Sequence, residues 1–387
     1  MNRLSRRDLL KSAPLAALPF VAGRGFAQDV PAKPTFPGMT VRMQEPQNLE
    51  FPFSELKSWI TPSEQFFIRS HFAVPKVDVQ TFKLTVEGHV ENKLELSLDD
   101  IRKMAPVTMP LTLECAGNGR VFLVPQGRGL QWGTGAVGNA EWTGVPLAAI
   151  LERAKVKAGS VEVILVGADK GAINSDPASP GPIHFDRSIP LEKATKPEVI
   201  LAYQMNGENL SASHGAPLRA VIGGWYGMAS VKWLSRIIVT DKPYNGFWQT
   251  FDYATFERRD GGLPTLKPIT AIQPKSSIAR PTEHEVVPAG KPYLVTGAAW
   301  AGEAKIARVQ ISSDGGKTWN DAKLTGVEKP FCWRTWEYLW NVPEVRGPVK
   351  LLTRAIDSNG QTQPEQRDID RRTYMINHLV AVEVLVR

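Results

Sequence analysis

The chain changes character about two thirds of the way along, and this change constrains its fold more than any other feature. From Pro292 onward, short runs of β-type residues are separated by turns, with almost no helical pattern. Such spacing predicts an all-β, immunoglobulin-like sandwich. The Cys…Trp…Cys spacing of antibody domains is missing, so only the architecture is predicted. The strand-like runs are 293–296, 307–312, 336–340 and 349–355.

The part of the chain before this change mixes strand and helix patterns in irregular order. Residues 82–86 alternate with period two, and 161–167 form a continuous apolar run that is typical of a buried strand. A capped helix is predicted over 97–103, where a serine begins the helical pattern, and a second helix over 146–154. This irregular alternation predicts a mixed α+β domain that ends near residue 265.

The charge of the chain does not indicate a nucleic-acid partner. The net charge is +7, from 46 basic and 39 acidic residues. Residues 1–27 hold five of the basic and one of the acidic residues, so the remainder carries 41 against 38, or +3. A chain this close to neutrality needs no polyanionic partner.

The N-terminal segment predicts export. Arg6 and Arg7 fit the twin-arginine pattern, an apolar stretch follows over 13–22, and the small residues around Ala27 suit cleavage. We therefore expect residues 1–27 to be a twin-arginine signal peptide and the mature chain to be periplasmic. Twin-arginine signals export proteins already folded, often with a cofactor. No later stretch approaches the ~20 consecutive apolar residues of a membrane span, so no membrane contact is expected.

Only two cysteines are present, Cys115 and Cys332. A disulfide between them is possible after export, but a chain of this size does not need one. The sequence has no Cys-x-x-Cys-His haem motif and no four-cysteine iron–sulfur set. Any metal must therefore be held by few protein ligands. Cys332, in a strand-like run, is expected to be an inert core thiol.

The stretch 111–120 is the most informative for chemistry. A strand-like run delivers Cys115 into a loop of small residues, and Arg120 follows five positions later. Small neighbours let a bulky group approach the sulfur, and a nearby cation favours the thiolate that ligates soft metals. A lone cysteine in such a context is more often a buried core thiol. However, the stretch closely resembles the Cys-Ala-Gly-Asn-x-Arg motif of the sulfite oxidase family, whose cysteine coordinates molybdenum.

The resemblance extends over nearly all of the mature chain and implies a substrate pocket. Segment 67–71 resembles the family's Phe-x-Arg-x-His segment, which implies that Arg69 faces the substrate and His71 contacts the pterin cofactor. The segments around Trp132 and Tyr253 resemble those that supply the pocket's tryptophan and tyrosine. Arg372 is a third arginine of the pocket on a looser match.

The same resemblance implies a cofactor site. Segments 214–219 and 231–234 resemble those that bind the pterin phosphate through His214, Arg219 and Lys232. Asp169 is assigned to the cofactor as well. The implied cofactor is one molybdenum–molybdopterin per chain, without haem.

These roles agree with the chemistry of sulfite. Sulfite is a small anion, and the planar fork of arginine suits oxyanions better than lysine does. Arg69 and Arg120 are therefore the first candidates for the anion pocket. The Tyr253 phenol can donate a hydrogen bond while remaining uncharged at neutral pH.

The resemblance implies a molybdopterin-binding domain of the sulfite oxidase type over 28–265, then the sandwich over 266–387 as a homodimerisation domain. The implied reaction is the oxidation of sulfite to sulfate. Because no haem domain precedes the molybdenum domain, electrons must pass to an external acceptor. A c-type cytochrome is expected for an exported bacterial protein. Plant sulfite oxidases also lack haem and use oxygen, so the sequence leaves the acceptor open.

Parts of the sequence also suggest other functions. Residues 312–319 match the Asp-box of sialidase propellers, which would indicate a secreted sugar-binding protein. A propeller would repeat the motif, and it occurs once here, so we interpret it as a structural hairpin. The molybdenum subunit of sulfane dehydrogenase is a closer alternative that the sequence barely separates. A peptide methionine sulfoxide reductase subunit is disfavoured because those chains lack the sandwich.

Overall fold

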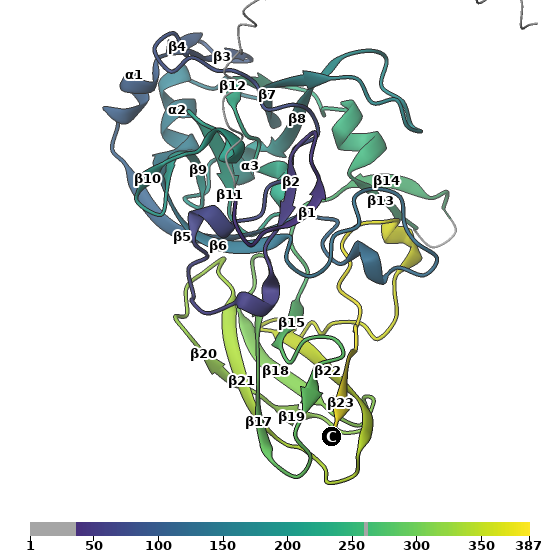
Figure 1. Cartoon of the computed structure of the whole chain (residues 1–387). Helices are drawn as coiled ribbons and strands as arrows, with labels where there is room; N and C mark the ends of the chain where they lie inside the picture. Colours follow the sequence, from purple (N-terminus) through teal and green to yellow (C-terminus); the bar gives the residue numbers. More distant parts are fainter. Residues whose placement is uncertain (1–35, 259–261) are drawn as a thin grey trace, which may run out of the picture. The chain divides into compact units, whose positions relative to one another are not determined.

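A computed structural model describes residues 36–258 and 262–387 (Figure 1). The predicted signal peptide, residues 1–27, lies outside the described residues. Within them, no helix is long and apolar enough to cross a membrane.

Two sheets form the framework of the described chain before residue 258, the first mixed and the second antiparallel. The first has the order β4-β3-β12-β7-β8, and the second has the order β10-β9-β6-β5 with β11 also paired to β9. The strands of the first sheet are β3 Leu84–Gly88, β4 Leu94–Leu96, β7 Glu162–Gly171, β8 Ile183–Pro190 and β12 Leu234–Thr240. Those of the second are β5 Val107–Glu114, β6 Val137–Pro146, β9 Val199–Met205, β10 Glu208–Asn209 and β11 Arg219–Ile222.

Three short helices accompany these sheets: α1 Leu98–Arg102, α2 Leu147–Ala154 and α3 Leu191–Ala194. The first two confirm the predicted helices. In α1, Ser97 Oγ accepts a hydrogen bond from the Asp100 amide at 3.1 Å, and Asp100 accepts one from the Ser97 amide at 3.0 Å. This is a complete capping box, which satisfies amides that the first turn leaves free. The apolar side of α2 is buried in the core.

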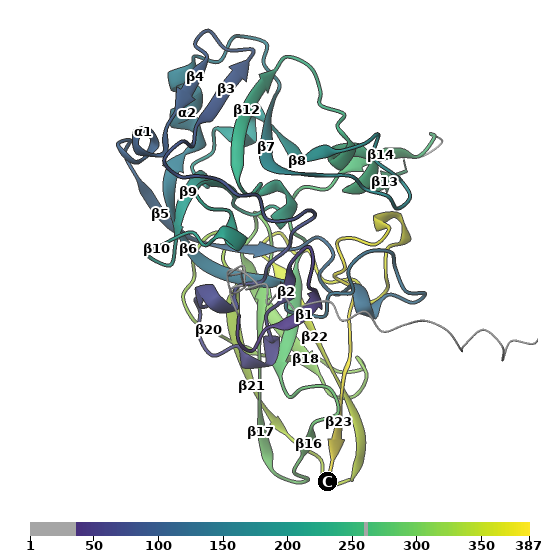
Figure 2. The same ribbon diagram turned by 45° about the horizontal axis from the view of Figure 1, so that its top comes forward.

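The C-terminal part is all β, as predicted, and Figures 1 and 2 show its long strands side by side. One sheet has the order β15-β17-β21-β20 and the other β16-β23-β22-β18-β19. Every predicted run lies in a strand, and the core between the sheets includes Val295, Val309 and Trp336. The strands are β15 Lys275–Arg280, β16 Val286–Val287, β17 Pro292–Trp300, β18 Ile306–Ser312, β19 Asn320–Asp321, β20 Lys323–Thr325, β21 Arg334–Asn341, β22 Gly347–Asp357 and β23 Val382–Val386.

Two hairpins complete the strand set. Strands β1 Thr40–Met43 and β2 Asn48–Glu50 pair with each other, as do β13 Ala254–Glu257 and β14 Thr265–Pro268. The first hairpin lies beside the segment that carries Arg69. The backbones of Leu49 and Ile68 join them through two hydrogen bonds of 2.9 Å. The second hairpin directly follows Tyr253.

The sandwich covers the open edge of β5. This strand ends the second sheet, so its outer amides and carbonyls have no partner there. The Thr112 amide donates to the Phe331 carbonyl at 2.9 Å, and the Trp333 amide donates to Thr112 Oγ1 at 2.8 Å. The strand that leads to Cys115 is therefore fixed on both sides.

Both cysteines are free and buried. Cys332 is the buried thiol that we predicted, and its Sγ lies 3.1 Å from the Pro110 carbonyl. Burial raises its pKa to about 12. The strand prediction is wrong at this residue. Phe331 has a positive φ of 61°, so the chain turns here, and β21 begins only at Arg334.

Candidate active site

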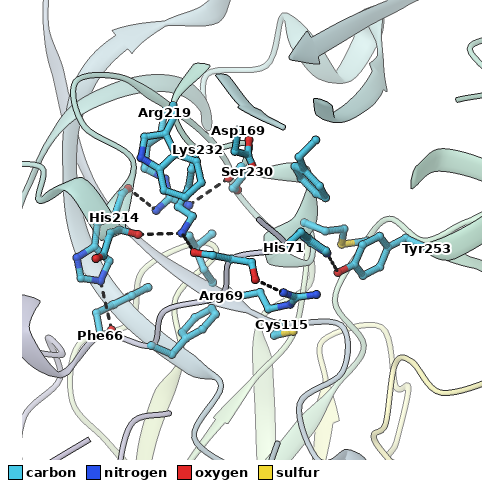
Figure 3. A pocket seen from close by; sticks show the side chains of 18 residues that line it. Phe66, Arg69, His71, Cys115, Asp169, His214, Arg219, Ser230, Lys232 and Tyr253 are labelled. Atoms are coloured by element: carbon cyan, nitrogen blue, oxygen red, sulfur yellow. Dashed lines mark hydrogen bonds between the residues drawn. The ribbon is translucent and has the colours of Figure 1, made fainter. Parts of the chain in front are cut away.

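A cavity of about 60 Å³ brings together most of the predicted site residues (Figure 3). Figure 3 shows Cys115, Arg69, His71 and Tyr253 at one end and His214, Arg219 and Lys232 at the other. Asp169 also lines the cavity. Eight of the eleven predicted residues thus meet in one place, although they are spread from residue 69 to residue 253.

Cys115 follows directly on β5, at the point where the chain turns away from the sheet. Its amide donates to the Ala136 carbonyl at 2.9 Å, and its own carbonyl accepts from the Asn118 amide at 2.9 Å. The side chain is 7% exposed. Burial raises the pKa of the thiol, whereas Arg69 and Arg120 favour the thiolate. A bound metal cation would lower the pKa of the thiol further and keep the sulfur deprotonated.

Tyr253 and His71 form a neutral pair. The tyrosine ends a π-helical turn over Trp248–Asp252, and its Oη lies 2.7 Å from His71 Nε2. Burial raises the pKa of Tyr253 and lowers that of His71 well below its usual value, an effect that Arg69 and Lys232 strengthen. Both groups are therefore uncharged at neutral pH. The imidazole also stacks on Phe185, with ring centroids 4.4 Å apart.

The other end of the cavity collects positive charge. Arg219 begins β11 and donates to the carbonyls of His214 and Ser230 at 3.0 and 3.1 Å. Lys232 Nζ donates to the Ser213 carbonyl at 2.8 Å and to Ser70 Oγ at 3.0 Å. Neither cation makes a direct salt bridge in the part of the chain that the structure describes, but Asp169 lies close enough to favour the charged form of Lys232. Burial lowers the pKa of Arg219 to about 9 and that of Lys232 well below its usual value.

These residues fit a molybdopterin-type group. Two buried cations without a direct salt bridge favour the binding of a negative group between them, and a phosphate is such a group. Asp169 is a second indication of a bound group, because its Oδ1 is buried and accepts no hydrogen bond from the protein. Burial raises its pKa to about 6. Among the described residues, no three His, Cys, Asp or Glu side chains gather to hold a metal.

Three predicted residues do not line the cavity, although each lies near it. The buried Arg120 guanidinium donates to the carbonyls of Thr373 and Leu130 at 3.1 and 2.8 Å. Trp132 is fully buried in the core cluster that contains Cys115, and its Nε1 has no partner. Arg372 donates to the carbonyls of residues 251, 252 and 254, and therefore holds the backbone around Tyr253.

Arg187 was not predicted from the sequence, and it is fully buried in β8. Its guanidinium carbon lies 6.0 Å from the centre of the Tyr253 ring. It donates to the carbonyls of Trp248 and Ile269 at 2.8 and 2.9 Å, and the backbones of these two residues are hydrogen-bonded to Tyr253. Arg187 thus fixes the turn that carries the tyrosine. An arginine within a strand pattern is normally solvent-exposed, so only the tertiary structure identifies it.

Two family models match the chain. The oxidoreductase molybdopterin binding domain matches residues 71–248, and the Mo-co oxidoreductase dimerisation domain matches residues 267–386. The first match holds most of the cavity residues. The second covers the sandwich.

Similar proteins agree with these matches. The mitochondrial sulfite oxidase of Rattus norvegicus is 35% identical over 346 residues, which are 85% of this chain and 62% of the rat protein. The sulfite oxidase of Arabidopsis thaliana is 33% identical over 88% of this chain and 92% of its own length. The crystal structure of the sulfane dehydrogenase SoxCD from Paracoccus pantotrophus is similar, with a TM-score of 0.74 and 28% identity over 87% of this chain and 83% of that one.

The chain thus spans only 62% of the rat protein but nearly all of the plant protein. With both domain models, the shared fold and this degree of identity, the chain belongs to the sulfite oxidase family.

Proposed function

We propose that this protein oxidises sulfite to sulfate with a molybdenum–molybdopterin cofactor and passes the two electrons to an external acceptor. The observation that carries the proposal is the cavity. It holds the Cys115 thiol beside Arg69 and Tyr253, and its other end contains the buried cations Arg219 and Lys232. The reaction takes one oxygen from water and releases two protons with the two electrons.

Each residue has a physical role in this proposal. His214, Arg219, Lys232 and Asp169 hold the cofactor, and Cys115 is the protein ligand of its metal. When bound, the cofactor supplies the two-electron redox chemistry. Arg69 binds the sulfite oxygens and orients the anion.

The remaining residues shape the substrate end. Tyr253 Oη exchanges a hydrogen bond with His71 and remains neutral, so it can bind a substrate oxygen without repelling it. Arg120 and Trp132 support the loop and core around Cys115 without lining the cavity. Arg372 holds the backbone on either side of Tyr253 through hydrogen bonds.

The setting of the reaction is part of the proposal. Export through the twin-arginine route would place the enzyme in the periplasm, where a c-type cytochrome is the proposed acceptor. The dimerisation-domain match supports a homodimer formed through the sandwich. No haem is proposed in this chain.

Sulfane dehydrogenase is the second candidate, favoured by the structural similarity to SoxCD. The two reactions differ in how the substrate arrives. A free sulfite ion needs a cationic pocket, whereas a carrier-bound sulfane depends less on one. Arg69 lines the cavity directly and therefore favours the free anion.

Metal analysis of the purified protein tests the proposal first. We expect about one molybdenum per chain in the parent protein and in Cys332→Ser, whose thiol is remote from the cavity. Cys115→Ser should fold but lose turnover of sulfite with cytochrome c. Full activity of Cys115→Ser, or a parent protein without molybdenum, would refute the assignment.

Kinetics of Arg69 variants test the substrate. Arg69→Gln should raise the KM for sulfite about ten- to hundred-fold, since a charged hydrogen bond contributes about 1.5–3 kcal/mol. Arg69→Lys should recover part of this loss because it keeps the charge without the planar fork. Arg102→Gln, in the exposed helix α1, is the control. A normal KM and normal inhibition by sulfate in Arg69→Gln would favour the sulfane reaction instead.

A further inference from the structure

The residue before the cysteine ligand is a buried carboxylate with all its acceptors in use. Glu114 is 1% exposed. Its Oε1 accepts from Lys275 Nζ and from Asn118 Nδ2, both at 3.0 Å, and its Oε2 accepts from Trp300 Nε1 at 2.8 Å. A buried acid beside a thiolate is unfavourable unless it is neutralised. Its partners are therefore part of the chemistry of the site.

The same contacts hold the loop that follows. Lys275 Nζ also donates to the Asn118 carbonyl at 2.9 Å, and Asn118 Oδ1 accepts from the Ala136 amide at 3.1 Å. The Ala136 carbonyl in turn accepts from the Cys115 amide. Lys275, Glu114 and Asn118 thus form a closed ring of hydrogen bonds around the turn at Cys115.

Two of the donors come from the sandwich. Lys275 begins β15 and Trp300 ends β17, and these strands are neighbours in one sheet. They lie 161 and 186 residues from Glu114 in the sequence. Lys275 Nζ also lies 5.8 Å from the centre of the Trp300 ring, so the two donors approach the carboxylate together.

We propose that Lys275 and Trp300 are positioning residues of the metal site, which neutralise and orient Glu114 and so hold the 115–120 loop in its ligating conformation. The second domain then has a role beyond dimerisation, because it completes the support of the cofactor's protein ligand. The inference rests on the proposed function, since it assumes that Cys115 binds molybdenum.

The physical reason is electrostatic. Removing Lys275 leaves the buried Glu114 charge unpaired next to a residue that must itself be negative to bind metal. Like charges disfavour each other strongly at low dielectric. Replacing both members of a buried pair costs far less than removing one of them. Neutralising Glu114 as well should therefore restore the site.

A four-protein cycle tests this: the parent, Lys275→Met, Glu114→Gln and the double variant. Each full-length, cofactor-loaded protein is dialysed against chelator, and the molybdenum retained per chain is followed with time. The Mo(V) electron paramagnetic resonance spectrum is recorded alongside. Lys275→Met should lose metal about ten- to hundred-fold faster, the usual effect of removing a supporting contact around a metal ligand. The double variant should return to within about three-fold of the parent.

Lys193 offers a matched control. Its side chain is 8% exposed, as is that of Lys275, and it also joins a carboxylate of the first part of the chain, Glu198 at 2.7 Å, to one near the sandwich, Glu303 at 2.9 Å. It lies outside the cavity lining. Lys193→Met should lower the midpoint of urea unfolding while metal loss and the resonance spectrum stay as in the parent.

The outcomes separate the inference from the function that it rests on. Parent-like retention in Lys275→Met, or equal loss in the single and double variants, would overturn the inference while the proposed function stands. If Lys275→Met cannot be purified, a folded, loaded double variant supports the inference, and a double variant that also fails to fold overturns it. A parent protein without molybdenum overturns both.

Discussion

Single residues in the cavity hold charge states that burial alone would oppose. Burial lowers the pKa of both Arg219 and Lys232, so an anion in the cavity would favour their charged forms. His71 and His214 show the opposite behaviour and stay neutral. The cavity therefore combines fixed positive charge for a phosphate with uncharged donors near Cys115.

Tyr253 should be the tyrosine that matters for turnover. Tyr253→Phe removes the hydroxyl that lies 2.7 Å from His71 and should lower kcat/KM for sulfite about ten- to hundred-fold, without loss of molybdenum. Tyr203→Phe is the control, since this ring lies in β9 beneath Arg102. Steady-state kinetics with metal analysis checks both. A larger defect in Tyr203→Phe would mean that the active-site tyrosine has been misassigned.

His214 should make the cofactor-free protein sensitive to acid. Burial lowers its pKa to about 3, an effect that Lys232 strengthens, whereas the unfolded chain takes up the proton near pH 6.5. The stabilisation is therefore complete above pH 6.5 and is lost as the pH falls toward 3, by up to ~1.4 kcal/mol per pH unit.

Urea unfolding at several pH values between 6.5 and 4.5 checks this effect. His214→Gln should flatten the pH dependence of the unfolding free energy relative to the parent, while His284→Gln, at an exposed position, should not. Asp169 acts with the opposite sign, because its pKa is raised, but it is present in all three proteins and cancels. Parallel curves for parent and His214→Gln would contradict the prediction.

Among the elements, the hairpin between β18 and β19 carries the motif that suggested a sugar-binding protein. Asp314 accepts hydrogen bonds from the amides of Lys317 and Thr318 at 3.0 and 2.9 Å and from Ser312 Oγ at 2.7 Å. Residue 314 thus closes the turn with its own side chain, as the structural interpretation requires. Arg354 packs over the ring of Trp319 at 4.1 Å.

Asp314→Ala should therefore affect stability alone. The melting temperature should fall by about 1–2 °C, the scale of a modest local loss in a protein of this size, with unchanged sulfite kinetics. Hydrogen bonds from Thr318 and Ser312 hold the pKa of Asp314 well below its usual range, so this contribution is present at neutral pH and lost only in strong acid. Ser313→Ala is the control, and calorimetry is the measurement. A kinetic defect in Asp314→Ala would contradict a purely structural hairpin.

At the scale of the whole molecule, the buried cations Arg219 and Lys232 should make the free energy of unfolding depend on cofactor binding. A ligand that binds only the folded state stabilises it by about 2.7 kcal/mol at a hundred times its Kd. We expect the cofactor-free protein to melt below the loaded one. Inorganic pyrophosphate should recover about 3–4 °C at such a concentration.

Arg219→Met should abolish this response to pyrophosphate. Arg354→Met is the matched control, because Arg354 also packs over a tryptophan but lies in the sandwich. Differential scanning calorimetry with and without pyrophosphate checks both variants. Equal responses in the parent and Arg219→Met would place the anion site elsewhere.

The sequence by itself determined the all-β C-terminal part, the two capped or amphipathic helices and the segments around Arg69, Cys115, His214 and Tyr253. These features depend on neighbours within about ten residues, whose spacing the chain fixes directly. The site residues were found because each lies in a short segment that resembles the family.

Only the tertiary structure decided which way each side chain points and which part of the chain covers each open sheet edge. Arg120, Trp132 and Arg372 lie near the cavity but point to backbone or core, which no local spacing reveals. Lys275 reaches Glu114 across 161 residues because the sandwich packs on the open edge of β5. Such contacts arise from the packing of whole sheets, and so they could not be predicted from the order of residues alone.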